Sequence, residues 1–445
     1  MAGLRLRLNA LRERARASLF LIPMAAVIGS VAAGAGALAL DRHFDRQPGN
    51  LPLGLVSTVD GARALLSTVA GATITFAGIA FSVSLLIIQQ ASSQYSPRVV
   101  HTLFRDPFNK RVMGLVVGTF TFCVIVLRSV RAPLEEGGVA IVPNVSVAFA
   151  VVLGIVTILA IVAFIDHSAH SMDVSEILER VRLEATEHIQ DTWRDPDSED
   201  GPSPARVAGA HGPGLTKIRF TQTGWIQQID FDAAIDAIDP GATLRLDTGP
   251  GRYAIAGTVL ATIDPAPEDL ERLEEAVNDA MATGATRTVQ QDAPYALRQL
   301  ADVALKALSP GINDPTTAQD AIFHLAAVLT EVLQRDPPQP TVTQRDDKHL
   351  IAAQQPTPAD LVHLAFAEIR RAAAELPAVC IYLLEAIELV SEPLVSIGMP
   401  DRAAPLLEEA ARIVDGCRTA DLIPGDLRDV EDAYRRRFEP PPQTT

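Results

Sequence analysis

Residues 145–165 read VSVAFAVVLGIVTILAIVAFI, 21 consecutive positions without a charged side chain. A helix needs about 20 predominantly apolar residues to cross the hydrocarbon core of a bilayer. Three further uncharged apolar stretches precede this one, at 17–40, 64–88 and 112–127. The last of these is short, so Arg128 at its end has to extend toward the headgroups. The four stretches predict membrane-spanning helices over residues 17–40, 64–90, 112–130 and 145–165.

Charge separates the membrane part from the rest of the chain. Residues 1–166 carry a net charge of +6 and residues 167–445 carry −22, which together make the total of −16. An acidic domain beside an anionic inner leaflet is consistent with a cytoplasmic location. Because no basic face is available to replace phosphate counterions, nucleic acid is excluded as a partner.

Basic residues orient the predicted helices. Five arginines precede the first span and are opposed only by Glu13, and four basic residues lie between spans two and three. Short loops rich in Lys and Arg stay in the cytoplasm. We therefore expect a multi-pass protein of the inner (plasma) membrane with both termini cytoplasmic. A cleaved signal peptide is the alternative for the first span, although its apolar run exceeds the usual length of about 7 to 15 residues.

Composition along the chain predicts its domains. We expect a basic N-terminal arm, a four-helix transmembrane domain, a juxtamembrane helix with a linker, a small β unit, a helical cytoplasmic domain and a disordered tail. Their respective bounds are 1–16, 17–166, 167–214, 215–264, 265–438 and 439–445. The predicted fold is thus membrane α-helical, followed by a cytoplasmic α+β, mostly helical domain with a small β-barrel-like unit.

The β unit contains the run GRYAIAGTVLATI at 251–263, after a Gly-Pro-Gly turn. This pattern is similar to the small β-barrel of lipoyl-type and regulatory domains. Because the run contains no lysine, covalent lipoyl or biotinyl attachment is excluded, and we expect no cofactor. A packed β unit and a ligand-sensing unit both remain possible at this point.

The second span carries a polar stripe. Its members are seven residues apart, close to two helical turns, so they share one helix face with a drift of about 20° per step. They are Thr68, Thr75, Ser82 and Gln89. Such a stripe either lines a water-filled path or forms hydrogen bonds with neighbouring helices. If it lines a path, Gln94, Tyr95 and Arg98 lie at its cytosolic mouth.

Ionisable residues are absent from the four apolar cores. Proton-coupled pumps and voltage sensors rely on such residues inside their spans. The sequence therefore favours a passive path, or no path, over an ion-coupled pump.

Two further groups are candidate ligand sites. Asp166, His170 and Asp173 follow the fourth span at helical spacing and are candidate metal ligands, with a solvated juxtamembrane helix as the alternative. Gly311, Asn313 and Asp314 precede a predicted helix N-terminus and are candidates for binding an anion, with simple capping as the alternative.

Catalytic and metal motifs are lacking. The three cysteines, Cys123, Cys380 and Cys417, form no CxxC pair, so neither a zinc site nor a disulfide framework is indicated. No nucleophile–base pair, phosphate-binding loop or HExxH motif is present. We therefore do not expect an enzyme.

Several motifs together resemble one protein family. They are SSQYSPR at 92–98, Asp166-His167, GWIQ at 224–227, LRQLAD at 297–302 and ALSPGINDP at 307–315. They are similar to the bacterial predicted-membrane-protein family catalogued as domain of unknown function 2254, from span one to about residue 420. Ala296 stands where the family is expected to have glycine after Tyr295. The resemblance implies an inner-membrane protein with a conjoined cytosolic domain, and it implies no activity.

Together these observations predict a lipid-embedded homo-oligomer that is channel-like or transport-related and is regulated by its cytosolic domain. The alternative is a non-transporting scaffold or sensor that recruits partners through the acidic domain. In the first case a small molecule or ion of unidentified nature is the ligand.

Overall fold

The computed structural model describes residues 20–44, 58–94, 107–131, 142–170, 173–195, 215–337, 343–345, 347–353 and 355–439. The described elements form two compact units, one that ends at Asp173 and one that begins at Val174. The predicted N-terminal arm, most of the linker and nearly all of the tail lie outside the described residues.

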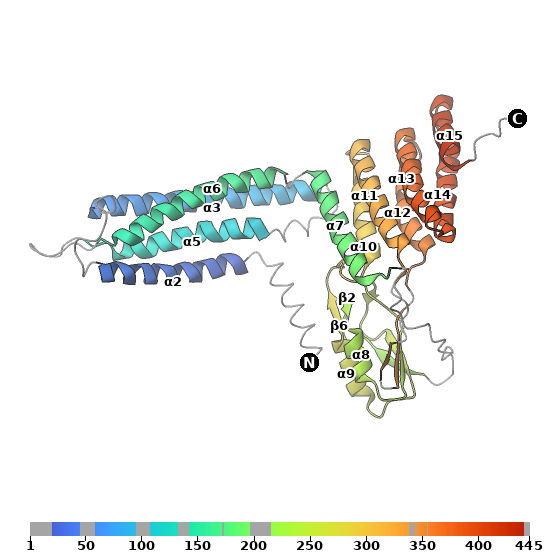
Figure 1. Ribbon diagram of the computed structural model, residues 1–445, viewed down its shortest axis with the longest axis horizontal. Coiled ribbons are helices and arrows are strands. Elements are labelled where there is room, and N and C mark those ends of the chain that lie inside the picture. Colours follow the sequence, from blue (N-terminus) through green and yellow to red (C-terminus); the bar gives the residue numbers. More distant parts are fainter. Residues whose placement is uncertain are drawn as a thin grey trace, which may run out of the picture. The chain divides into compact units, whose positions relative to one another are not determined.

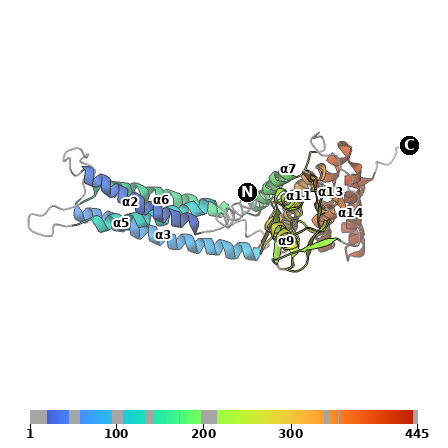
Figure 2. The same cartoon turned by 90° about the horizontal axis from the view of Figure 1, so that it is seen from below.

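The first unit consists of four long apolar helices that run alongside one another (Figure 1, Figure 2). They are α2 (Leu21–Phe44), α3 (Val59–Gln94), α5 (Pro107–Ser129) and α6 (Asn144–His170). Each is long and apolar enough to cross a membrane. The four predicted spans are thereby confirmed as candidate membrane helices, and α3 is the longest at 36 residues.

Small residues bring α5 close to α2. A side chain at Gly114 would lie 3.3 Å from the Cβ of Ala26, and one at Gly118 would lie 2.8 Å from the hydroxyl of Ser30. Glycines four residues apart allow helix backbones to approach in this way. The Gly-x-x-x-Gly motif of the third span therefore packs two helices of the same chain.

Polar contacts hold α6 in the unit. The hydroxyls of Thr119 on α5 and Thr157 on α6 are 3.0 Å apart and fully buried. Asp41, near the end of α2, accepts hydrogen bonds from the backbone N–H groups of Val145 (2.8 Å) and Ser146 (3.0 Å). A carboxylate at a helix N-terminus satisfies N–H groups that have no partner within the helix. Asp41 therefore caps α6 across about a hundred residues of sequence.

The second unit is mostly helical and has two rows of helices (Figure 1). In one row α7 (Val174–Thr192) packs on α11 (Pro315–Gln334), α11 on α13 (Pro377–Ser396), and α13 on α15 (Pro424–Phe438). In the other row α10 (Ala293–Ala307) packs on α12 (Pro358–Ala373), and α12 on α14 (Pro400–Thr419). The helices α11 to α15 all begin with proline, which tolerates the first position because the N–H there has no helical partner.

Two sheets accompany the helices, a larger mixed sheet and a smaller antiparallel sheet. The larger has the strand order β1-β5-β3-β8-β7, and the smaller has the order β4-β2-β6. Their bounds are β1 Thr216–Arg219, β2 Gly224–Ile229, β3 Thr243–Leu246, β4 Tyr253–Ala254, β5 Val259–Asp264, β6 Met281–Gly284, β7 Thr343–Arg345 and β8 Lys348–Ile351. Two short helices, α8 (Phe231–Ala237) and α9 (Leu270–Asp279), pack with them over a shared apolar core.

These sheets correct the prediction of a β-barrel-like unit. Within the described residues the strands form two open sheets and no closed barrel. The sheets also extend beyond residues 215–264, because β6 pairs with β2 and β8 pairs in parallel with β3. Leu350 of β8 is fully buried in the sheet core beside Leu244. Burial of this side chain stabilises the pairing of the distant strand β8 with β3. The remainder of the predicted fold class is confirmed: candidate membrane helices precede a mostly helical domain with small sheets.

Candidate functional site in the membrane helices

The polar stripe of α3 lies on the face that points away from the other described helices of its unit. Thr68, Thr75, Ser82 and Gln89 are all exposed. The opposite face, with Leu66, Ala70 and Ala80, is buried against α5 and α6. Packing among the described helices of this unit therefore does not account for the stripe.

Each hydroxyl of the stripe donates a hydrogen bond to its own helix. Thr68 donates to the carbonyl of Ala64 at 2.7 Å, Thr75 to that of Gly71 at 2.9 Å, and Ser82 to that of Gly78 at 3.0 Å. Because a hydroxyl has one donor and two acceptor lone pairs, its oxygen keeps acceptor capacity after this bond. The stripe therefore presents hydroxyl oxygens as acceptors on an open helix face.

Glycines and exposed apolar side chains surround the stripe. A Cβ added at Gly71 or Gly78 would meet no heavy atom within 4 Å. Large apolar side chains flank the stripe, and Ile79 and Leu86 are 50% and 61% exposed. Such a surface fits either lipid or a second protein chain, and it allows close approach of another helix at the glycines.

The three residues predicted at a cytosolic mouth are not placed by the structure. Gln94 is the last residue of α3, and its side chain is not described. Tyr95 and Arg98 lie outside the described residues. Their role stays a prediction.

The candidate metal ligands are described only in part, so their role likewise stays a prediction. Asp166 belongs to α6 and Asp173 follows it, whereas the side chain of His170 is not described. Among the described residues no group of three His, Cys, Asp or Glu side chains has the arrangement of a metal site. The neighbouring His167 contacts the ring of Phe108, with centroids 4.7 Å apart.

The loop before α11 uses its polar groups internally. The carboxylate of Asp314 accepts from the backbone N–H groups of Thr316 (3.2 Å) and Thr317 (3.1 Å). The N–H groups of Ile312 and Asn313 donate to the carbonyl of Ser309. The hydroxyl of Thr317, followed by the backbone N–H groups of Thr317 and Thr316, holds the pKa of Asp314 below its usual value. An anion at this helix end would have to displace Asp314.

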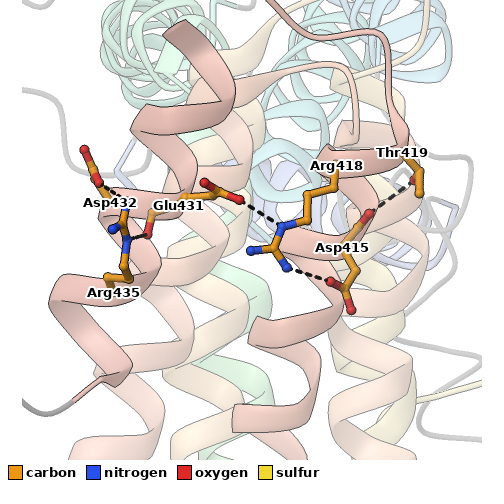
Figure 3. Close-up of polar contacts among 6 residues, drawn as sticks. All are labelled: Asp415, Arg418, Thr419, Glu431, Asp432 and Arg435. Atoms are coloured by element: carbon orange, nitrogen blue, oxygen red, sulfur yellow. Dashed lines mark hydrogen bonds and ion pairs between the residues drawn. The ribbon is translucent and has the colours of Figure 1, made fainter. Parts of the chain in front are cut away.

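A groove of about 370 Å³ lies between α14 and α15 in the second unit. Figure 3 shows Arg418 of α14 between two carboxylates, at 3.1 Å from Asp415 and 2.9 Å from Glu431 of α15. Arg435 of α15 pairs with Asp432 at 2.6 Å. Both arginines lie among carboxylates of this chain, so the groove offers no unpaired cation to a ligand. The ion pair between Arg418 and Glu431 instead joins α14 to α15, whereas the other two pairs each lie within one helix.

Sequence reasoning missed a partly buried cluster between the small sheet and α10. Arg287 forms two hydrogen bonds, of 2.8 and 2.9 Å, with the carboxylate of Asp292, and it lies over the rings of Trp225 and Tyr295. Burial raises the pKa of Asp292, and the charge of Arg287 opposes that shift. The one signal in the sequence was Gly251, whose lack of a side chain leaves room for this carboxylate. The cluster ties the small sheet to the helices.

The family comparison supports the membrane assignment. The family described as "Predicted membrane protein (DUF2254)" matches residues 16–388. The chain belongs to this family. Uncharacterized proteins from Mycobacterium bovis and Mycobacterium tuberculosis are each 29% identical to it over 442 residues, covering 94% of this chain and 80% of the relative. No solved structure matches the chain. The family is thus a membrane protein family, and its description names no activity.

Proposed function

We propose that this member of the family is a homo-oligomeric, channel-like protein of the inner membrane whose subunits meet along α3. The observation that carries the proposal is the exposed stripe Thr68, Thr75, Ser82 and Gln89. A helix that faced only lipid would gain nothing from four polar side chains in register. Facing subunits, in contrast, would place these side chains around a shared axis.

The chemistry of the stripe favours a passive path. Its hydroxyl oxygens act as acceptors, and the apolar core of the second span contains no ionisable residue. Oxygen acceptors replace the hydration of small cations and bind water, whereas anions need donors or positive charge. We therefore infer that water and small cations pass in preference to anions, and the proposal assigns no reaction to the chain.

Orientation and regulation complete the proposal. The excess of Lys and Arg before span one and between spans two and three supports cytoplasmic termini. The net charge of −22 beyond residue 166 then lies in the cytoplasm, where the domain can regulate the path. A scaffold that recruits basic partners through this charge is the alternative, and it requires no path along α3.

Cysteine accessibility tests the proposal. Thr75→Cys and Ser82→Cys, each in a Cys123→Ser background, are reconstituted and treated with a charged, membrane-impermeant thiol reagent. We expect both to react, because a charged reagent reaches only water-filled sites. Thr73→Cys is the matched control on the buried face, and Ile74→Cys is the control for an exposed apolar position away from the stripe.

Flux provides the second measurement. Reconstituted protein is expected to pass small cations into vesicles, and the charged reagent is expected to reduce that flux in the Thr75→Cys variant. If Thr75→Cys and Ser82→Cys are as unreactive as Ile74→Cys, the stripe is dry and the proposal fails. Oxidative cross-linking of Thr75→Cys between subunits separates a dry subunit interface from a lipid-facing stripe.

A further inference from the structure

Two cysteines that are far apart in sequence meet inside the second unit. Cys380 lies in the first turn of α13 and Cys417 in the last turn of α14. Their sulfur atoms are 3.2 Å apart, and the residues are 1% and 0% exposed. The chain's third cysteine, Cys123, belongs to α5 in the membrane-helix unit. The pair therefore has no competing thiol within its own unit.

We propose that Cys380 and Cys417 form a two-electron redox site, which a peroxide oxidises to an intramolecular disulfide that joins α13 to α14. This proposal is independent of a path along α3.

The chemistry balances with hydrogen peroxide as the oxidant. One thiolate attacks a peroxide oxygen and breaks the O–O bond, which gives a sulfenic acid and one water molecule after proton transfer. The second thiol then attacks the sulfenic sulfur, and the S–S bond forms as a second water molecule leaves. The two thiols lose two electrons and two protons in total, and the peroxide is reduced to two water molecules.

Hydrogen bonds hold the two sulfurs together. Cys380 donates its S–H to the carbonyl of Ala373 at 3.1 Å. Cys417 donates its S–H to the sulfur of Cys380 at 3.2 Å. Because the sulfurs are already neighbours, the same disulfide forms whichever thiolate attacks the peroxide first.

Burial selects the oxidant and the route. A small peroxide reaches the sulfurs after local opening of the helices, whereas a bulky disulfide needs a much larger opening. Oxidation should therefore accelerate in urea concentrations below those that unfold the protein. The disulfide would in turn hold the start of α13 against the end of α14 and slow this opening.

Peptide mapping of the full chain tests the proposal. Purified protein in detergent is treated with hydrogen peroxide, alkylated with iodoacetamide and digested with trypsin, which places Cys380 in peptide 372–402 and Cys417 in peptide 413–418. We expect these peptides to be joined and two of the three thiols to be lost. The thermal midpoint should rise by about 5 to 10 °C, and a phosphine reductant should reverse the rise.

Variants make the result specific. Cys123→Ser is expected to leave the cross-link unchanged, whereas Cys417→Ser should abolish both the cross-link and the change in thermal midpoint. If Cys417→Ser does not fold, the joined peptides of the unsubstituted protein still decide the matter. Cys380 and Cys417 both remaining as free thiols after peroxide treatment in mild urea, a sulfinic acid on either residue, or a disulfide between chains would each overturn the proposal.

Discussion

At the scale of single residues, Thr73 and Thr75 show how one helix face differs from another. Thr73 is 3% exposed and donates to the carbonyl of Val69, whereas Thr75 is exposed and donates to that of Gly71. Both hydroxyls are satisfied by their own helix, so hydrogen bonding does not decide which one is buried. The helical phase relative to α5 and α6 decides it.

His188 of α7 should make the second unit sensitive to acid. Burial lowers the pKa of His188, because the charged imidazolium loses its hydration. The unfolded chain therefore takes up a proton first, near the ordinary value of 6.5, and the free energy of unfolding falls as the pH drops from 7 toward the folded pKa. His188→Gln should reduce this fall, measured by thermal unfolding at pH 7 and pH 5. His363→Gln, on the exposed side of α12, is the control and should retain it.

Gly251 should resist substitution more strongly than Gly257. Both have positive φ, 78° and 87°, so an alanine at either is strained by about 1 to 2 kcal/mol. Only at Gly251 would the added Cβ also overlap the buried carboxylate of Asp292. We expect Gly251→Ala to lower the free energy of unfolding by about 1 to 3 kcal/mol more than Gly257→Ala, measured by urea unfolding in detergent. Equal losses would show that Asp292 moves away freely.

At the scale of elements, the position of the neighbouring helix decides whether glycines on a helix face form a packing contact. Gly114 and Gly118 face Ala26 and Ser30 of α2, whereas Gly71 and Gly78 of α3 face open space. The same residue type thus closes one helix pair and leaves another helix face free. Sequence spacing identifies both as packing faces, but only the position of the partner helix separates them.

Gly118→Ala should loosen α2 from α5. The new Cβ would lie 2.8 Å from the hydroxyl of Ser30, which is closer than van der Waals contact allows. We expect a loss of about 1 to 3 kcal/mol, seen as a lower midpoint of thermal unfolding in detergent. Gly36→Ala on α2, where nothing lies within 4 Å, is the matched control and should be neutral or slightly stabilising, because alanine favours the helix. A loss of the same size in both variants would contradict this packing.

At the scale of the whole molecule, the uneven distribution of charge predicts on which side of the membrane each part of the chain lies. We predict that Asn313→Cys, in an exposed loop of the second unit, is labelled by an impermeant maleimide only after cells are permeabilised. Asp60→Cys, at the exposed start of α3, should be labelled in intact cells, and both variants are made in a Cys123→Ser background. Labelling of Asn313→Cys in intact cells would reverse the proposed orientation.

Much of the architecture was visible in the sequence by itself. Each membrane helix needs an unbroken apolar run, and each run is a local property that can be read position by position. Proline at the first position likewise marked the starts of α11 and α12, at Pro315 and Pro358. The phase of the polar stripe on α3 was also local, because the seven-residue spacing is enough to define one face.

Contacts between distant segments were decided only by the tertiary structure. The parallel pairing of β8 with β3, the capping of α6 by Asp41 and the meeting of Cys380 with Cys417 each join residues that no local pattern connects. The physical reason is the same in each case. Burial and hydrogen bonding stabilise residues that meet in space, and the residues adjacent to them in the sequence show no pattern that predicts the meeting. By itself the sequence determined which segments are membrane helices, and the fold determined which faces they leave open.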